Sequence, residues 1–251
     1  MNSKNKKIGA VIQARTASTR LPEKIFKSLD GIPLIEQIIL KVKKSEFIDD
    51  VIIATTDKDN DLKLVNWCKL KNIKCFTGDA ADVLSRYYYC AKYYELDVII
   101  RITSDNPLID IEIVNKVIKL FEDGYDYAAN NYKKTFPHGL DVEVMSFSSL
   151  EESFKKANKE YEREHVTQYI RHNPKIFKIG NLESGGSYHN IRITVDTSED
   201  LKLVREIVKI GGINIKFNDI INIFKDNIKL LETNMISMKN HKIYNKKNNI
   251  I

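Results

Sequence analysis

The sequence predicts an α/β fold with a mostly parallel sheet sandwiched by helices. Short apolar runs alternate with longer stretches of helical period, which is the pattern of βαβ units. The first apolar run also ends in a polar, cationic loop, at the position where open α/β sheets bind ligands. A chain of 251 residues with 43% hydrophobic and 29% charged residues suits an ordinary globular domain and excludes a disordered or collagen-like chain.

The first half of the chain consists of strand and helix patterns in regular alternation. Each short apolar run is followed by a segment whose apolar residues recur every three or four positions. Pro33 stands at the start of the first such segment, and Asp59 or Asn60 caps the second. The predicted strands are 8–12, 51–54, 73–76 and 98–102, and the predicted helices are 34–42, 59–70, 79–94 and 110–121.

The regular alternation stops after residue 121. Residues 182–190, with Gly185 and Gly186, are expected to form a mobile loop. The Lys- and Asn-rich chain from Met238 onward is expected to fray or to be disordered. Ser198 is the expected N-cap of the last predicted helix. Extended segments are predicted at 125–129, 141–147, 175–179 and 191–195, and helices at 148–157, 161–171 and 198–208.

The basic character of the chain comes from its two ends. Lys and Arg total 40 against 34 Asp and Glu, but residues 1–7 and 239–251 hold lysines and no acid. The body between these tails is therefore near neutral, which argues against nucleic-acid binding. Three cysteines without a CxxC pair predict neither a disulfide framework nor a zinc site, so a reducing cytoplasm is expected. No apolar stretch of about 18 residues occurs, so no membrane association is expected.

The loop at 13–24 is the strongest chemical signal in the sequence. It combines three cations, Arg15, Arg20 and Lys24, with three hydroxyl side chains. Backbone N–H groups and guanidinium forks in such a loop suit a polyphosphate. The alternative, for charges alone, is a solvated surface loop. The GxxxxGK[ST] spacing of a Walker loop is absent.

Two aspartates follow predicted strands and are candidate metal ligands. Asp105 follows the strand at 98–102, and Asp196 follows the extended segment at 191–195. Parallel strands bring their carboxyl ends to one edge, so the two carboxylates can converge on one Mg²⁺ that also takes phosphate oxygens. The alternative is that each aspartate caps a turn or a helix. Arg101 and Arg192 precede these loops and either balance the carboxylates or reach the substrate.

Five blocks of the sequence carry a family resemblance. They are IQARTASTRLPEK at 12–24, RITSDNPLID at 101–110, FPHGLDVEV at 136–144, YEREHVTQYI at 161–170 and RITVDTSEDL at 192–201. In this order they resemble the cytidylyltransferases that activate acidic sugars, namely the acylneuraminate and 3-deoxy-octulosonate cytidylyltransferases. The resemblance is strongest to the related spore-coat polysaccharide biosynthesis branch, and it covers about residues 8–208.

This resemblance implies a glycosyltransferase-A-like fold and a CTP-dependent reaction. A single nucleotidyltransferase domain at 8–237, between the basic tails 1–7 and 238–251, would carry a smaller acceptor and dimerisation lobe at about 131–190. The enzyme would join CMP to an acidic sugar or a related, for example phosphorylated, small acceptor and release pyrophosphate, in the synthesis of surface polysaccharide precursors. A homodimer is also implied.

The resemblance assigns roles to residues of three groups. The triphosphate would be held by Arg15, Arg20 and Lys24, with Gln13 and Ala14 near the nucleotide. Magnesium would be held by Asp105 and Asp196, which together with Arg15 and Lys24 are the implied catalytic residues. The acceptor would be contacted by His138, Gly139, Asp141, Glu164 and His165.

Without the family, the acceptor candidates have simpler interpretations. His138 and Gly139 suit a tight turn into a strand, and Glu164 and His165 suit a solvated helix face. The chain also departs from the spore-coat branch in two places. Thr16-Ala17 stands where that branch usually has Met-Gly, and His138 stands where it often has Arg, which leaves the charge and size of the acceptor open.

Two other functions remain open at this point. A glycosyltransferase with a nucleotide-sugar donor shares the implied fold and would use a DxD metal pair, for which Asp57, Asp59 and Asp61 are candidates, although caps and turns also explain them. A non-catalytic nucleotide-sensing protein is the third interpretation. The cationic loop favours a triphosphate over a diphosphate-sugar, and the intact Arg15, Lys24, Asp105 and Asp196 favour an enzyme.

Overall fold

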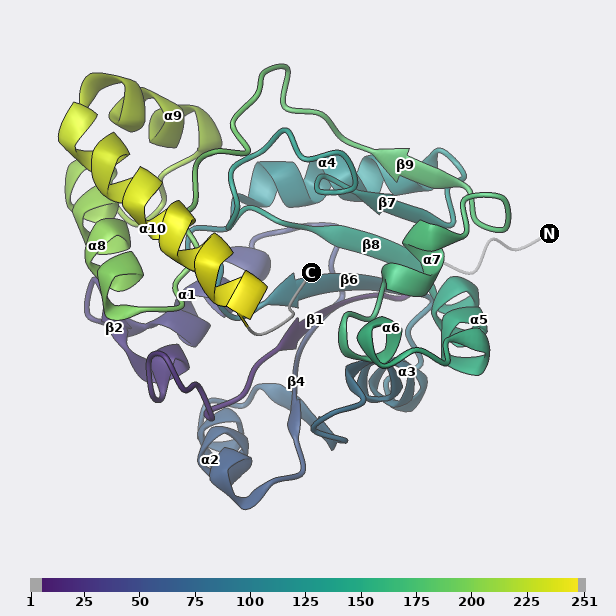
Figure 1. Ribbon diagram of the computed structural model, residues 1–251. Helices are drawn as coiled ribbons and strands as arrows, with labels where there is room; N and C mark the ends of the chain where they lie inside the picture. The colour runs from purple at the N-terminus through teal and green to yellow at the C-terminus, as the bar shows by residue number, and fades with distance from the viewer. Residues whose placement is uncertain (1–5, 248–251) are drawn as a thin grey trace.

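A seven-stranded sheet forms the centre of the molecule (Figure 1), and the computed structural model describes residues 6–247. The strand order is β5-β4-β1-β6-β8-β7-β9. Their bounds are β1 Ile8–Gln13, β4 Asp50–Thr56, β5 Lys74–Gly78, β6 Val98–Thr103, β7 Tyr127–Ala129, β8 Glu143–Ser146 and β9 Ile179–Asn181. A two-stranded ribbon of β2 (Ser28–Leu29) and β3 (Ile32–Pro33) lies outside this sheet.

Strand β8 alone runs against its neighbours in the sheet. The pairs β5–β4, β4–β1, β1–β6 and β7–β9 are parallel, whereas β8 is antiparallel to both β6 and β7. The predicted mostly parallel sheet is therefore confirmed. The carboxyl ends of six strands and the amino end of β8 consequently share one edge, and that edge positions the candidate site.

Helices cover both faces of the sheet with separate hydrophobic clusters. One cluster packs α1 (Leu34–Val42), α2 (Leu62–Leu70), α4 (Ile111–Glu122), α8 (Ser198–Gly211) and α9 (Phe217–Asp226) against residues such as Ile12 and Ile100. The other packs α3 (Val83–Tyr93), α5 (Phe147–Lys156) and α7 (Gln168–His172) against Val11 and Ile99. Neighbouring residues of β1 and β6 thus face opposite clusters, as the twofold period of a strand requires.

The first half of the chain follows the predicted elements with small shifts at their ends. The helix predicted at 79–94 begins only at Val83, because Asp82 caps it by accepting a hydrogen bond from the Ser85 N–H. The side chain of Asp79 instead accepts hydrogen bonds from the backbone of Ala81 and Asp82, which forms the preceding turn.

Three of the elements predicted between residues 161 and 195 are wrong. The helix predicted at 161–171 is two short helices, α6 (Glu160–Glu164) and α7, because Val166 between them adopts a left-handed backbone with φ of 57°. Residues 175–178 turn, and the strand predicted there begins at Ile179. Residues 191–195 take part in an isolated bridge between His138 and Arg192, and they belong to none of the strands of the described sheet.

The C-terminal segment is helical where disorder was expected. Helix α10 (Ile228–Lys247) includes residues 238–247, so that part of the prediction is wrong, while residues 248–251 lie outside the described residues, as does most of the basic stretch 1–7. Asn234, which is fully buried, and Ser237 attach α10 to the rest of the chain through hydrogen bonds. Polar anchoring of this kind leaves little hydrophobic periodicity in a sequence.

Within residues 6–247, none of the helices has both the length and the apolar character needed to cross a bilayer.

Candidate active site

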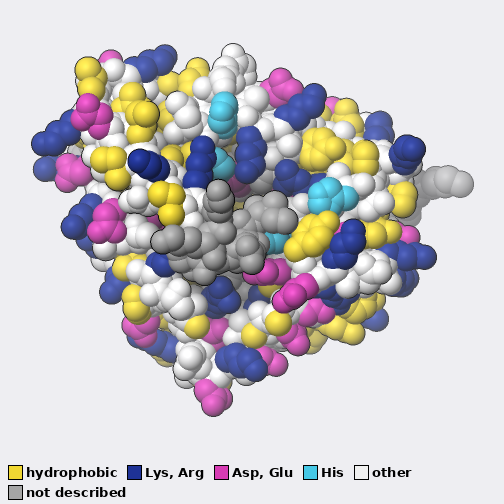
Figure 2. Space-filling view, viewed as in Figure 1, with side chains coloured by type: hydrophobic (Ala, Val, Ile, Leu, Met, Phe, Trp, Pro, Cys, Tyr) yellow, Lys and Arg dark blue, Asp and Glu magenta, His cyan; other side chains and the backbone are white. Residues whose placement is uncertain are grey.

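The candidate site lies at the edge of the sheet where six strands end. Gln13 ends β1 and Thr103 ends β6, and the two residues are register partners. Glu143 begins β8 and pairs with Arg101 on one side and Ala129 on the other. Figure 2 shows Lys, Arg and His side chains gathered near the centre of the face that looks onto this edge.

A cationic cluster surrounds the carboxylate of Asp196. Lys24 Nζ lies 2.7 Å from Asp196 Oδ1, and Arg20 contributes a nitrogen 3.3 Å from the same oxygen. Arg192 donates to the other oxygen, Oδ2, over 2.7 Å. Burial acts to raise the pKa of Asp196, but Lys24, Arg20 and Arg192 outweigh it and lower the pKa to about 2. The structure thus brings two of the three predicted loop cations, Arg20 and Lys24, and the predicted Asp196 into one cluster.

Asp105 adjoins this cluster through the backbone. The Val195 N–H donates to the Asp105 carbonyl over 2.8 Å, and Lys24 Nζ also donates to the Val195 carbonyl over 3.1 Å. The carboxylate of Asp105 accepts a short hydrogen bond from Thr103. The two loops that carry Asp105 and Asp196 therefore lie side by side, as expected, although the segment before Asp196 is not a strand.

The donor set at this edge fits Mg²⁺ held together with phosphate. Among residues 6–247, no group of three or more His, Cys, Asp and Glu side chains is arranged to hold a metal ion by itself. Mg²⁺ usually takes one or two carboxylates and fills its octahedron with phosphate oxygens and waters. The carboxylates of Asp105 and Asp196 suit that arrangement, and Asp196 would exchange a lysine or arginine contact for the metal.

Asp141 adds a third carboxylate near Asp105. It accepts a hydrogen bond from the Gly139 N–H over 3.1 Å. Burial raises the pKa of Asp141, and the nearby carboxylates of Asp105 and Glu143 raise it further against the opposing effect of the Gly139 hydrogen bond. Like charges converge at this point, which is a common feature of sites that receive a cation.

The cationic loop is anchored to the loop after β4. Thr16 donates its backbone N–H to Asp61 Oδ1 over 2.6 Å and its hydroxyl to the same oxygen over 2.7 Å, and Thr56 donates to Asp61 Oδ2. Burial acts to raise the pKa of Asp61, but these hydrogen bonds lower it below its usual value. Thr16 is therefore a structural residue of this loop, and Asp61 is an anchor with both oxygens engaged.

The remaining nucleotide candidates occupy the start of that loop. Ala14 is buried and its N–H donates to the Ala54 carbonyl over 3.1 Å, while Gln13 accepts from Arg101 over 3.1 Å. The side chain of Arg15 is exposed. Gln13 and Ala14 are thus fixed by the sheet, and Arg15 projects from it.

A buried ion network around Glu143 links the loop to the region at 131–190. Glu143 forms a short ion pair with Arg101 and accepts hydrogen bonds from Tyr127 over 2.6 Å and from Thr167 over 2.7 Å. Arg171 lies 3.7 Å away. Burial acts to raise the pKa of Glu143, but Arg101 and Arg171 outweigh it and lower the pKa. The sequence leaves open whether Arg101 balances carboxylates or reaches the substrate. It does not single out Glu143, although an acid that alternates with apolar residues in a strand pattern is a signal for this position.

Arg86 is a second residue that the sequence analysis missed. It is only 4% exposed, and its Nε and Nη1 atoms have no hydrogen-bond partner in the structure. Burial, reinforced by Arg15, lowers its pKa against the opposing effects of Tyr87 and Asp61. A buried guanidinium with unpaired donors beside a cationic loop suits an anionic or carbonyl-bearing ligand. An arginine among the apolar positions of a helix was the available signal.

The acceptor candidates fall into two groups. His138, Gly139 and Asp141 lie on the chain that pairs with residues 191–193, at the same edge as Asp105. Glu164 and His165 end α6, where Glu164 is exposed and His165 is half-buried. Burial lowers the pKa of His138 to about 4, with the nearby Lys134 and Arg192 acting in the same direction, so its imidazole is neutral at pH 7.

Gly139 is explained by packing within the chain. Its φ is 110°, and a Cβ atom there would lie 2.8 Å from Ile193 Cγ1 and 2.9 Å from backbone atoms of Ile193 and Thr194. Only glycine accepts both the conformation and the contact. The backbone at Gly139 therefore approaches the segment that leads to Asp196 closely.

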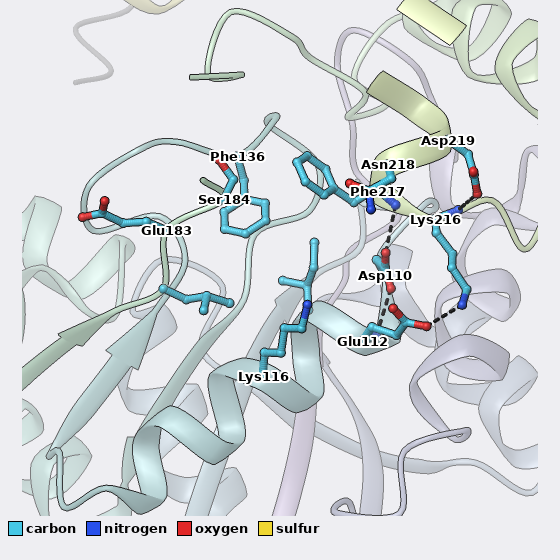
Figure 3. A pocket seen from close by; sticks show the side chains of 12 residues that line it. Asp110, Glu112, Lys116, Phe136, Glu183, Ser184, Lys216, Phe217, Asn218 and Asp219 are labelled. Atoms are coloured by element: carbon cyan, nitrogen blue, oxygen red, sulfur yellow. Dashed lines mark hydrogen bonds and ion pairs between the residues drawn. The ribbon is translucent and has the colours of Figure 1, made fainter. Parts of the chain in front are cut away.

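A cavity of about 510 Å³ lies apart from these residues (Figure 3). Its walls are the start of α4, the start of α9 and the loop at 182–184, with Phe136 and Phe217 as aromatic surfaces. Asp110 connects two of these walls because it accepts hydrogen bonds from the N–H groups of Glu112 and Phe217. Of the predicted site residues, none lines this cavity.

Comparison with known proteins identifies the family. A family model described as cytidylyltransferase matches residues 10–243. The chain belongs to the cytidylyltransferase family. It is therefore a nucleotidyltransferase, and the family match favours this function over the glycosyltransferase alternative. Asp61, one of the aspartates considered for a DxD pair, is a buried anchor of the loop.

Individual relatives agree with this assignment. The chain is 39% identical to an uncharacterized protein of Methanocaldococcus jannaschii over 91% of this chain and 94% of the relative. It is 32% identical to the spore coat polysaccharide biosynthesis protein SpsF of Bacillus subtilis, over 80% of this chain and 86% of that protein.

Solved structures show the same fold. A cytidylyltransferase from Leptospira borgpetersenii matches with a TM-score of 0.85 and 31% identity, over 90% of this chain and 97% of that one. A CMP:2-keto-3-deoxy-manno-octonic acid synthetase complexed with CTP matches with a TM-score of 0.62 over 81% of this chain and 98% of that one. At 18% identity, the second likeness shows the fold alone.

Proposed function

We propose that this enzyme transfers CMP from CTP to a small acidic sugar or a related acceptor at the edge of the sheet that carries Asp105 and Asp196. The observation that carries the proposal is the contact of Lys24 and Arg20 with the buried carboxylate of Asp196. Cations that converge at the carboxyl ends of parallel strands suit a triphosphate. The acidic acceptor is supported by the likeness to SpsF and to a 3-deoxy-manno-octulosonate cytidylyltransferase of Fusobacterium nucleatum, which is 35% identical over 46% of this chain.

In this proposal the chain works by positioning charges. The acceptor hydroxyl gives up its proton to water as its oxygen forms a bond to the α-phosphorus. The bond from that phosphorus to the bridging oxygen breaks, and pyrophosphate leaves with the electron pair. Arg15, Arg20 and Lys24 hold the β- and γ-phosphates and neutralise the charge that develops on the leaving pyrophosphate. Gln13 and Ala14, fixed at the end of β1, place the nucleotide.

Mg²⁺ would be held by Asp105 and Asp196 in the proposed enzyme. When bound, the ion supplies charge neutralisation at the phosphates. His138 and Asp141 are proposed to meet the acceptor, and Glu164 and His165 are proposed to contact its far end. A homodimer and a cytoplasmic location remain predictions of the family resemblance.

The proposal is tested by pyrophosphate release. The purified protein is incubated with Mg²⁺, each of the four nucleoside triphosphates and a panel of acidic sugars and phosphorylated small acceptors. The expected result is release with CTP and one acceptor class, loss of release with excess EDTA, and its return with Mg²⁺. Release with another triphosphate in place of CTP, or release that persists in both Asp105→Ala and Asp196→Ala, would contradict the proposal.

A further inference from the structure

Helix α10 forms hydrogen bonds with Arg192, the residue whose guanidinium group contacts the carboxylate of Asp196. In Figure 1 this helix, drawn in yellow, runs from the side of α9 toward the middle of the view. Asn234 of α10 is fully buried and makes two hydrogen bonds to the backbone of Arg192, one with the N–H over 3.3 Å and a shorter one with the carbonyl. The helix is thereby attached to the segment that leads to Asp196.

Ser237, one turn further along α10, completes a buried charge network. Its hydroxyl donates to Asp200 Oδ1 over 2.5 Å and accepts from Arg192 Nη1 over 3.1 Å. Arg192, which is 3% exposed, donates through Nη1 to Asp200 and through Nη2 to Asp196, over 2.5 and 2.7 Å. One arginine fork therefore joins the serine of α10 to the carboxylate of the proposed phosphate site.

Asp200 also fixes the backbone on which Asp196 stands. Its Oδ2 atom accepts hydrogen bonds from the N–H groups of Asp196 and Thr197, each over 2.9 Å. Thr197 and Asp200 form the capping box of α8, so the cap is Thr197 and the predicted N-cap Ser198 is one residue too late. Asp200 thus has the structural role expected of an acid in a first helical turn, and Ser237 holds it from the opposite side.

Arg192 differs from the other two cations on Asp196 in its surroundings. Lys24 and Arg20 come from the loop that is proposed to hold the triphosphate, with side chains 15% and 26% exposed, whereas the side chain of Arg192 is 3% exposed. If Lys24 and Arg20 contact the triphosphate as proposed, the buried Arg192 is the cation expected to keep its contact with Asp196. Its orientation then depends on Asp200 and on Ser237.

We infer that Ser237 is a positioning residue for the nucleotide side of the active site, and that α10 is consequently part of the catalytic apparatus. It acts through Arg192 and Asp200, which hold the carboxylate of Asp196. The inference rests on the proposed binding of a triphosphate by Lys24 and Arg20. Supporting groups of this kind change the affinity or rate of a site without touching the substrate.

The experiment compares three variants of the full chain. Ser237→Ala removes the hydroxyl, and Ser237→Thr keeps it. Thr233→Ala removes an exposed hydroxyl of the same helix that donates to the Lys229 carbonyl. Initial rates give kcat and KM for CTP and for the acceptor, calorimetry gives the Kd of CTP with Mg²⁺, and thermal unfolding of each variant reports folding.

The inference predicts a selective effect on the nucleotide. Ser237→Ala is expected to lower kcat/KM for CTP and to weaken CTP binding about tenfold, with KM for the acceptor changed less than twofold. Ser237→Thr and Thr233→Ala should retain wild-type values, and all three should unfold within a few degrees of wild type.

Two results would overturn the inference. One is a Ser237→Ala protein that binds CTP as wild type does, and the other is an equal loss toward CTP and acceptor that Ser237→Thr does not restore. Failure of the wild-type protein itself to bind CTP would instead overturn the proposed function, so the two failures are distinguishable.

Discussion

Lys24 Nζ lies 2.7 Å from Asp196 Oδ1, a contact that joins residues 172 positions apart in the sequence. It connects the loop after the first strand to the segment that leads into α8. The same carboxylate meets Arg20 and Arg192, so removing Lys24 leaves it paired, whereas removing Asp196 leaves three cations without it. The two substitutions should therefore differ in their effect on stability.

Lys24→Met is expected to lower kcat at least 100-fold and to change the unfolding temperature little. The lysine is proposed to neutralise the departing pyrophosphate, and the loss of one such group costs about 3 kcal/mol of transition-state stabilisation. Asp196→Asn should abolish activity and also destabilise the fold by about 3 kcal/mol, since buried Arg192 loses a charge partner. Steady-state kinetics and thermal unfolding measure both effects. Equal destabilisation by the two variants would contradict this assignment of contacts.

Thr16→Val is expected to destabilise the protein by about 1–3 kcal/mol, because it removes a hydroxyl that donates to the buried carboxylate of Asp61. The loosened loop should also raise KM for CTP several-fold. Thr19→Val is the matched control, since Thr19 is an exposed threonine of the same loop. Urea unfolding of both variants measures the change in stability, and initial rates measure the change in KM for CTP. If the two variants behave alike, Thr16 is not an anchor.

Glu143→Gln is expected to cost about 3–5 kcal/mol, because Arg101 then remains buried without its carboxylate. The loss should be visible as a large fall in unfolding temperature. Glu112→Gln offers a comparison at the surface, where the pair with Lys216 is exposed and the unfolding temperature should hardly move. A Glu143→Gln protein as stable as wild type would show that the Arg101 network does not stabilise the fold.

The stability of the protein should fall as the pH drops from about 6.5 to about 4, in part because of His138. Its pKa is about 4 in the folded chain and near 6.5 when unfolded, so the unfolded chain takes up the proton in this window. The resulting loss in the free energy of unfolding reaches about 3 kcal/mol once the pH is below both pKa values. Urea unfolding at several pH values, with His138→Gln as comparison, measures it. If the free energy of unfolding of His138→Gln falls with pH as steeply as that of the wild type, His138 is not the cause of the fall.

The alternation of apolar runs was sufficient to predict the sheet and the helices of the first half. Those elements obey local periods of two and 3.6 residues, and tertiary packing does not override them. Local pattern failed where long-range contacts decide the structure. Val166 takes a left-handed conformation within a helical pattern. Residues 191–195, predicted as a strand, contact the chain around His138 through an isolated bridge and do not join the sheet.

The candidate site shows the same division. The cations of the loop and the two aspartates were predictable from residue type and from their place after apolar runs, supported by the family resemblance. The sequence did not predict that Arg192 is the partner of Asp196 or that Glu143 is the partner of Arg101. It also did not predict the contacts of Asn234 and Ser237 on α10. These contacts join residues far apart or depend on a helix that has no hydrophobic period, so no local pattern predicts them.

Calorimetric titration of CTP, in the presence of Mg²⁺ and absence of acceptor, tests the central claim most directly. Wild-type protein should bind CTP more tightly than UTP, and Lys24→Met should weaken the binding of CTP at least tenfold while its fold remains intact. Equal affinity of wild type and Lys24→Met for CTP would contradict the claim that the Lys24–Asp196 cluster is the triphosphate site.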